Sequence, residues 1–406
     1  MSERFLPFHV PDIGREELCS VSKTLQSGWL TSGPRVSEFE AAFASACGAR
    51  YALAVNSCTA GLHLAMAALG IGRGAEVITT PLTFCATVNT ILHLGADPVL
   101  VDVGPDLNID EDRIAAFITP NTRAILPVHL AGLPCELDAV RRLARQHHLH
   151  VVEDAAHAAG AMYKGTVIGG SDSDATVFSF YATKNLTTGE GGMITTGSAD
   201  LEDRMRSLSL HGISRDAWNR YGEKANWYYE VLQCGFKYNM SDIMAAIGLV
   251  QLRKLDRMNA RRSYVAARYR LAFREMEEIE LPPDRADCRH AWHLYVLRLN
   301  LDRLNIHRAQ FIEEMRRRGI GCSVHFIPIP LHPYYRRALR MRDACPRALA
   351  EYPRLVSLPL YSKMTDEDVE RVVSAVREIL GRHRKRQAIS VPAQTHVAEG
   401  VPEAGC

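Results

Sequence analysis

Short apolar segments of strand length alternate with segments of helical periodicity between about residues 50 and 200. The expected strands, in chain order, are residues 51–57, 76–80, 97–103, 123–129, 150–155, 175–181 and 191–196. The expected helices between the strands are residues 59–70, 87–95 and Leu137–His148. Strands without polar interruption, separated by helices, indicate a mostly parallel sheet that is covered on both faces. The alternation therefore predicts an α/β fold.

The pattern changes after about residue 240, where a long helical segment over residues 241–270 begins at the candidate N-cap Ser241. Further strands are expected at residues 290–299 and 320–326, and further helices near His307–Arg318 and at residues 366–380. This pattern predicts a smaller C-terminal α+β domain. We expect a large domain over residues 1–240, which includes the N-terminal arm, and a smaller domain over residues 241–386. Residues 387–406 have no apolar periodicity, which predicts a disordered tail.

Composition excludes several classes of protein. A net charge of +2 over 406 residues gives no electrostatic case for binding nucleic acid. The ten cysteines contain no C-x-x-C pair, which argues against a zinc site and against a disulfide framework. The N-terminus lacks the apolar core of a signal peptide, and no apolar stretch approaches the ~18 residues of a membrane span. We therefore expect a cytoplasmic enzyme with reduced thiols.

Two of the expected strands are followed by residues that carry chemistry. Asp154 closes the strand over 150–155, at the carboxyl edge where α/β proteins bind ligands. Lys184 lies between the strand over 175–181 and the glycine-rich TTGEGG. Each residue alone also has a plain structural interpretation, as an exposed strand end or a surface lysine. Lys164 lies in a polar turn that suits a surface hairpin better than a buried site.

These groups suit pyridoxal phosphate (PLP), which needs a lysine for its aldehyde, an acid at its ring nitrogen, a phosphate cradle and a stacking group. The helix over 59–70 directly follows a strand, so its N-terminal amides, with Thr59 and Ala60 in the first turn, suit a phosphate. Ser179 precedes the lysine by five residues and suits the same phosphate. Phe84, just after the next strand, suits the ring face. The order of these residues predicts a PLP enzyme.

The same residues resemble the DegT/DnrJ/StrS family of nucleotide-sugar aminotransferases, whose members share the aspartate-aminotransferase fold. The resemblance spans about residues 5–380 and is carried by SGWLTSGP, AVNSCTAGLHLA, VITTPLTFCAT, VVEDAAHAAGAMYKG, FSFYATKNLTTGEGG, FKYNMSD and HAWHLY. It implies that Lys184 holds the cofactor's aldehyde and that Asp154 pairs with the ring nitrogen. It places His157 beside the ring oxygen and Phe84 on the ring face. Asn239 is implied to reach the phosphate of the neighbouring subunit in a homodimer with shared active sites.

The resemblance also implies a reaction. The expected activity is transfer of an amino group from glutamate to a UDP- or dTDP-linked 4-keto sugar, which gives a 4-amino sugar nucleotide. Among subgroups, the chain is most similar in appearance to the aminotransferase that makes UDP-4-amino-4-deoxy-L-arabinose. Trp29 and Thr31, in SGWLTSGP, and His325, in SVHF, are candidate sugar-site residues.

Three alternatives remain open from the sequence. The first is a 3-keto sugar or carbocycle aminotransferase on the same scaffold. A sugar dehydratase of the same family is a second, although such enzymes carry histidine in place of Lys184. A non-catalytic regulator on a vestigial PLP fold is the third, and the intact set of Lys184, Asp154 and phosphate ligands argues against it.

Overall fold

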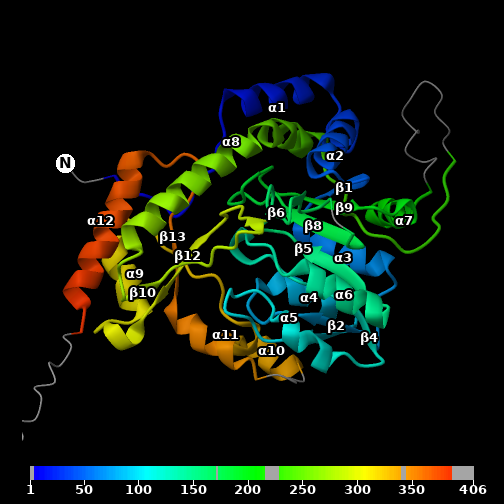
Figure 1. The fold of residues 1–406 in the computed structure, drawn as a ribbon. Helices are drawn as coiled ribbons and strands as arrows, with labels where there is room; N and C mark the ends of the chain where they lie inside the picture. The colour runs from blue at the N-terminus through cyan, green and yellow to red at the C-terminus, as the bar shows by residue number, and fades with distance from the viewer. Residues whose placement is uncertain (1–3, 171, 215–227, 340–343, 386–406) are drawn as a thin grey trace, which may run out of the picture.

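A seven-stranded sheet forms the centre of the computed structural model, which describes residues 4–170, 172–214, 228–339 and 344–385 (Figure 1). The strand order is β1-β9-β8-β5-β4-β2-β3. The bounds are β1 Tyr51–Val55, β2 Glu76–Thr79, β3 Asp97–Leu100, β4 Thr122–Ile125, β5 His150–Asp154, β8 Ala175–Ser179 and β9 Gly192–Thr196. Strand β9 is antiparallel to both of its neighbours, and the other pairs are parallel. The predicted mostly parallel sheet is therefore confirmed.

Helices cover both faces of this sheet. They are α2 Pro34–Cys47, α3 Cys58–Ala68, α4 Cys85–His93, α5 Glu111–Ile114, α6 Leu137–His147 and α7 Ala199–Ser209, whereas α1 Arg15–Ser27 packs on the long helix α8, Asp242–Phe273. Successive residues of β5 show how the two faces are filled, because Val151 packs in one core cluster with α2 and α6 and Val152 in another with α3 and α7. Side chains of a strand alternate between faces, so a strand buried on both reads as a continuous apolar run.

The second half of the chain begins with the 32-residue helix α8, Asp242–Phe273. Ser241 caps it, since its hydroxyl accepts a hydrogen bond from the Met244 amide at 3.4 Å, as predicted. An antiparallel sheet β10-β12-β13 follows, with bounds Ile279–Glu280, Tyr295–Leu299 and Leu355–Leu358. The remaining helices are α9 Arg308–Arg317, α10 Pro333–Ala338, α11 Pro346–Glu351 and α12 Asp366–His383. An α+β arrangement was expected here.

One expected strand in this half, residues 290–299, is confirmed only over β12, and another, residues 320–326, is wrong. Residues 290–294 form a loop before β12, in which Trp292 has a φ of 48° and the Ala291 amide donates to the Gly132 carbonyl at 2.9 Å. Residues 320–326 form only single bridges, from Ile320 to Leu6 and from Ser323 to Ser357. In both segments the backbone bonds to loops of distant parts of the chain, which a local apolar pattern does not reveal.

The N-terminal arm was expected to belong with the large domain, and Leu6 of this arm contacts the second half of the chain. The Leu6 amide donates to the Gly319 carbonyl at 2.7 Å, and the Gly321 amide donates to the Leu6 carbonyl at 2.9 Å. Leu6 packs in the core cluster of α9 and α12. The division of the chain after residue 240 stays a prediction. The expected disordered tail lies outside the described residues.

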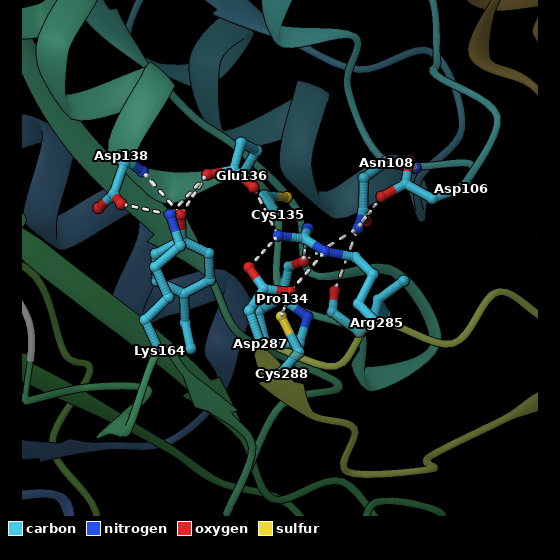
Figure 2. Close-up of polar contacts among 12 residues, drawn as sticks. Asp106, Asn108, Pro134, Cys135, Glu136, Asp138, Lys164, Arg285, Asp287 and Cys288 are labelled. Atoms are coloured by element: carbon cyan, nitrogen blue, oxygen red, sulfur yellow. Dashed lines mark hydrogen bonds and ion pairs between the residues drawn. The ribbon is translucent and has the colours of Figure 1, made fainter.

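A polar network joins the loop after β10 to the start of α6. Figure 2 shows Arg285 between Glu136 and Asp287, whose carboxylates it meets at 2.5 and 2.8 Å. Beside it, β11 (Cys288–Arg289) pairs with β6 (Met162–Tyr163), which forms a hairpin with β7 (Thr166–Val167). Lys164 lies in the turn of that hairpin and meets Asp138 at 2.6 Å (Figure 2). The network anchors the segment that leads into the 290–294 loop.

In the part of the chain that the structure describes, no helix is long and apolar enough to cross a lipid bilayer. The cytoplasmic location expected from the sequence stays a prediction.

Gly248 sets how closely α8 approaches α2. A Cβ atom at this position would lie 2.6 Å from ring atoms of Phe39, which is fully buried. We expect Gly248→Ala to lower the melting temperature by several degrees, because overpacking a core typically costs about 1–3 kcal/mol. Gly381→Ala is the matched control, since a Cβ there meets nothing within 4 Å and alanine favours the interior of α12. Equal melting temperatures for the two variants would contradict the close α2–α8 contact.

Candidate active site

Asp154 lies at the carboxyl end of β5 and is 5% exposed. Its carboxylate accepts a hydrogen bond from the Thr87 hydroxyl at 2.8 Å and from the Ala156 amide at 3.1 Å. Burial raises the pKa of the Asp154 carboxyl, and these two hydrogen bonds oppose the shift. Among the described residues, no arginine or lysine forms an ion pair with it. The site therefore holds a buried acid that can pair with a cationic N–H.

Lys184 lies in the turn after β8. Strand β8 pairs with β5, the strand that ends at Asp154. Burial lowers the pKa of the Lys184 amine to about 8, and the nearby Cys58 and Asp154 oppose this shift. A lysine with this pKa is partly neutral near physiological pH, so its Nζ can act as a nucleophile and as a base. Lys164, by contrast, lies exposed in the β6–β7 turn, and its hydrogen bond to Asp138 raises its pKa.

The N-terminus of α3 lies against the end of β9. The Ser57 side chain caps the helix by accepting from the Ala60 amide at 3.1 Å, and Thr59 is exposed in the first turn. Ser179 pairs with Gly192, where a Cβ atom would lie 2.7 Å from the Cys58 amide nitrogen. Glycine at 192 thus lets the start of α3 lie close to Ser179. A helix N-terminus suits an anion, because its first amides have no partner within the helix.

Aromatic rings and imidazoles form one wall of the site. The Phe326 ring stacks on His157 at 5.7 Å between centroids and lies 6.0 Å from Phe84, which is 59% exposed. His157 Nδ1 accepts from the Ala131 amide at 3.2 Å, and burial holds the pKa of His157 well below its usual value. His157 is therefore neutral, with its proton on Nε2.

His325 also faces this region. Its Nδ1 lies 2.8 Å from the Ser357 hydroxyl, and its ring stacks on Phe8 of the N-terminal arm at 5.5 Å. Burial lowers the pKa of His325 to about 4, and the charge of Lys184 adds to the shift. His325 is thus a neutral group near the lysine.

Three expected site residues, Trp29, Thr31 and Asn239, lie around Ser32, and Asn239 also pairs with Val55 at the end of β1. Trp29 Nε1 donates to the Ser32 carbonyl at 3.1 Å, and Thr31 is exposed in the same loop. Asn239 Nδ2 donates to the Ser32 hydroxyl at 2.7 Å. Together they form a second group at the loop between α1 and α2, beside the start of α8.

The sequence analysis did not single out four residues that the structure places in the site: Thr87, Asn185, His293 and Phe326. Thr87 lies one helical turn after Phe84, and Asn185 directly follows Lys184. Both had a positional signal, because they flank residues already selected. His293 and Phe326 come from the C-terminal half and had none. In the described residues no cluster of His, Cys, Asp and Glu is arranged to hold a metal ion.

Comparisons with known proteins identify related aminotransferases. A model of the DegT/DnrJ/EryC1/StrS aminotransferase family matches residues 11–377. The chain is 51% identical over 379 residues to the spore coat polysaccharide biosynthesis protein SpsC of Bacillus subtilis, covering 93% of this chain and 97% of SpsC.

Solved structures of aminotransferases also superpose on this chain. Spr1654 of Streptococcus pneumoniae, assigned as a sugar aminotransferase and solved in its PMP form, superposes with a TM-score of 0.87 at 33% identity, covering 93% of this chain and 99% of that one. The same protein was also solved in a PLP form. Helicobacter pylori PseC, an aminotransferase involved in the biosynthesis of pseudoaminic acid, superposes with a TM-score of 0.86 at 28% identity, covering 94% and 100%.

The low pKa of Lys184 predicts selective labelling. In protein freed of PLP, reductive methylation of Lys184 should rise with pH to a midpoint near 8, because the neutral amine is the reactive form. Lys164 should lag behind it, since its hydrogen bond to Asp138 raises its pKa. Peptide mass spectrometry over pH 6–10 measures both. A Lys184 midpoint above that of Lys164 would contradict the geometry described.

Proposed function

Because this chain belongs to the DegT/DnrJ/EryC1/StrS aminotransferase family, we propose that it transfers an amino group from glutamate to carbon 4 of a UDP- or dTDP-linked keto sugar. The family makes the chain a PLP-dependent sugar aminotransferase; the nucleotide, the position of the ketone and the donor are our proposal. The observation that carries it is the low-pKa amine of Lys184 near the buried carboxyl of Asp154.

The site fits pyridoxal phosphate in three respects. Asp154 is buried, and its side-chain hydrogen bonds come from neutral donors, the Thr87 hydroxyl and the Ala156 amide, as suits an acid that pairs with a ring N–H. Gly192 lets the N-terminus of α3 lie close to Ser179 where a phosphate is expected, and Lys184 has an amine reactive near neutral pH. When bound, PLP supplies an electron sink for the carbon that loses a proton.

We assign the proton transfer to Lys184 Nζ. A group whose pKa is close to the working pH accepts and returns a proton most effectively, and about 8 meets that condition. Asp154 keeps a proton on the cofactor's ring nitrogen by charge, and the Thr87 hydroxyl fixes the carboxylate at 2.8 Å for that contact.

We assign the remaining cofactor contacts by position. Thr59, Ala60 and Ser179 hold the phosphate at the α3 N-terminus, and Phe84 covers the ring. His157 donates from Nε2 to the ring oxygen, because its Nδ1 is already occupied by the Ala131 amide. A neutral donor at this place stabilises a phenolate without adding a full charge to the pocket.

The substrate side rests on a smaller set of observations. SpsC is named for spore coat polysaccharide biosynthesis, and PseC for pseudoaminic acid biosynthesis, which supports a sugar as the acceptor. His325 is a neutral imidazole near Lys184, suited to hydrogen bonding with a sugar hydroxyl. We assign Trp29 and Thr31 to the sugar nucleotide of a neighbouring site, since they flank Ser32, whose hydroxyl accepts from Asn239, the residue proposed to serve the neighbouring subunit.

A homodimer with shared sites accounts for the second group of residues. Exposed apolar side chains surround it, namely Leu18 and Leu25 on α1 with Trp29 and Leu30 in the following loop. Apolar exposure of this kind on a soluble enzyme favours a protein contact. A two-fold contact here brings Asn239 of each chain to the other chain's phosphate, reciprocally.

A substrate panel tests the proposed reaction. Purified enzyme with glutamate should release 2-oxoglutarate with a UDP-4-keto pentose or a dTDP-4-keto-6-deoxy hexose, and not with a 3-keto sugar nucleotide or a free carbocyclic ketone. Lys184→Ala should reduce turnover at least about a thousandfold, because general acid–base catalysis alone contributes roughly 10²–10⁴. Lys164→Ala is the matched control and should retain turnover, since this lysine lies in an exposed turn.

Each other result is informative. Amination of only the 3-keto sugar would refute carbon 4, and amination of only the carbocyclic ketone would refute the nucleotide-sugar class. Glutamate that gives no product while another amino acid does would refute the donor.

Mixing two inactive variants tests the shared site. In a heterodimer of Lys184→Ala and Asn239→Ala chains, one site combines an intact Lys184 with the partner's intact Asn239. If the subunits exchange, mixing the two folded variants forms the heterodimer. If they do not exchange, the two chains are co-expressed with different tags and the heterodimer is purified through both tags. We expect about half of the wild-type activity per dimer from this species. Activity no higher than that of the Asn239→Ala homodimer would show that each site uses its own Asn239.

A further inference from the structure

The side chain of Asn185, the residue after Lys184, is fixed on all sides. It is 5% exposed. Its Nδ2 donates to the Ala291 carbonyl at 2.7 Å and to Asn259 Oδ1 of α8 at 2.8 Å. Asn259 is itself oriented, because its Nδ2 donates to the Ala159 carbonyl at 2.9 Å. A carbonyl oxygen can only accept, so both amides have one possible orientation.

This orientation fixes the protonation of His293. Asn185 Oδ1 lies 3.2 Å from His293 Nδ1, and both Asn185 amide protons are already used. Only an Nδ1–H can complete that contact, so neutral His293 carries its proton on Nδ1. His293 is 6% exposed, and its burial keeps the pKa well below the usual value.

His293 in turn packs on His157. Their ring centroids lie 4.4 Å apart with 37° between the planes. His157 receives the Ala131 amide on Nδ1, which leaves its proton on Nε2. The backbone of Ala131 also contacts the segment that carries His293, because the Ala131 carbonyl accepts a hydrogen bond at 3.2 Å from the amide of Leu294, the next residue. One set of hydrogen bonds thus determines both imidazoles.

We propose that Asn185 is a positioning residue that acts through His293: its amide keeps His293 uncharged and in a single tautomer where it packs on His157, and so keeps the Nε2–H of His157 available to the cofactor. This inference rests on the proposed role of His157 at the cofactor's ring oxygen. It adds to that role the reason why His157 stays neutral and fixed.

The charges around His293 explain why an amide serves here. The cationic groups that face it are Lys184, Arg262 on α8 and, if protonated, His157 and His325. A carboxylate at position 185 would attract a proton onto His293 and place a charge 4.4 Å from His157. An amide orients the imidazole without charging it.

Hydrogen exchange at the histidine C2 position measures this directly. The full-length protein, freed of PLP, is incubated in D₂O over pH 5–9 and analysed by mass spectrometry at His157 and His293. In the wild type we expect slow, pH-independent exchange at both residues. Asn185→Asp, which has the same shape but no N–H donors, should give His293 a titration midpoint within this range. The PLP dissociation constant of the Asn185→Asp variant, measured by absorbance titration, should be at least tenfold higher than that of the wild type.

Asn305→Asp is the matched control. Asn305 is exposed, its backbone amide bonds to the His383 carbonyl, and the substitution adds the same charge far from the site. It should leave His293 exchange and PLP affinity at wild-type values. An unchanged His293 profile in Asn185→Asp, or PLP affinity within twofold of wild type, would overturn the inference.

A second set of variants keeps the inference testable if Asn185→Asp does not fold. Asn185→Ala and His293→Phe are compared singly and together for PLP affinity. If Asn185 acts through His293, its substitution should weaken binding no more than twofold once His293 is phenylalanine. Fully additive losses would overturn the inference. No substrate is used in these measurements, so a failure of the proposed sugar specificity does not affect their outcome.

Discussion

A buried carboxylate is the constraint on which the site depends. Asp154 lies at the edge of an apolar sheet, where an uncompensated charge costs several kcal/mol. The Thr87 hydroxyl and the Ala156 amide satisfy part of its demand for hydrogen bonds, and the amine of Lys184, in the turn after the adjoining strand, supplies opposite charge nearby. The same environment lowers the pKa of the lysine to about 8. The charges of the acid and the amine thus affect each other's pKa, and a cofactor with a cationic ring nitrogen can pair with the negative charge of Asp154.

The C-terminal half supports this centre from a distance. Arg262 of α8 is 2% exposed, and its Nη1 donates to the carbonyls of Trp292, His293 and Leu360 at 3.3, 3.3 and 2.7 Å. Arginine offers several donors in a rigid plane, so one side chain can hold two segments of loop. The polar network around Arg285 anchors the same loop from its other end (Figure 2). A histidine supplied by this loop therefore meets the lysine turn with little freedom.

The sequence predicted the sheet and its order of elements, because strands buried on both faces leave continuous apolar runs. It also placed Asp154, Lys184 and the α3 N-terminus together, since the carboxyl ends of parallel strands meet at one edge. The roles of these residues stay predictions until they are tested. His293 and Phe326 had no local signal, because their position depends on loops from opposite halves of the chain. Residues 320–326 were wrongly expected as a strand for the same reason: their partners, Leu6 and Ser357, lie far away in the sequence.

The contacts of the N-terminal arm have a consequence for how the protein is made. Leu6 pairs with Ile320, His9 meets the backbone at Ala182, and Phe8 stacks on His325. The ribosome produces this arm before Ala182 and long before Ile320 and His325, so the surface that binds the arm emerges later than the arm itself. A nascent chain that already contains the lysine and the acid still exposes Leu6 and Phe8, which are apolar side chains of the kind that chaperones bind. Leu6 and Phe8 can thus reach their place only after Ile320 and His325 have been synthesised.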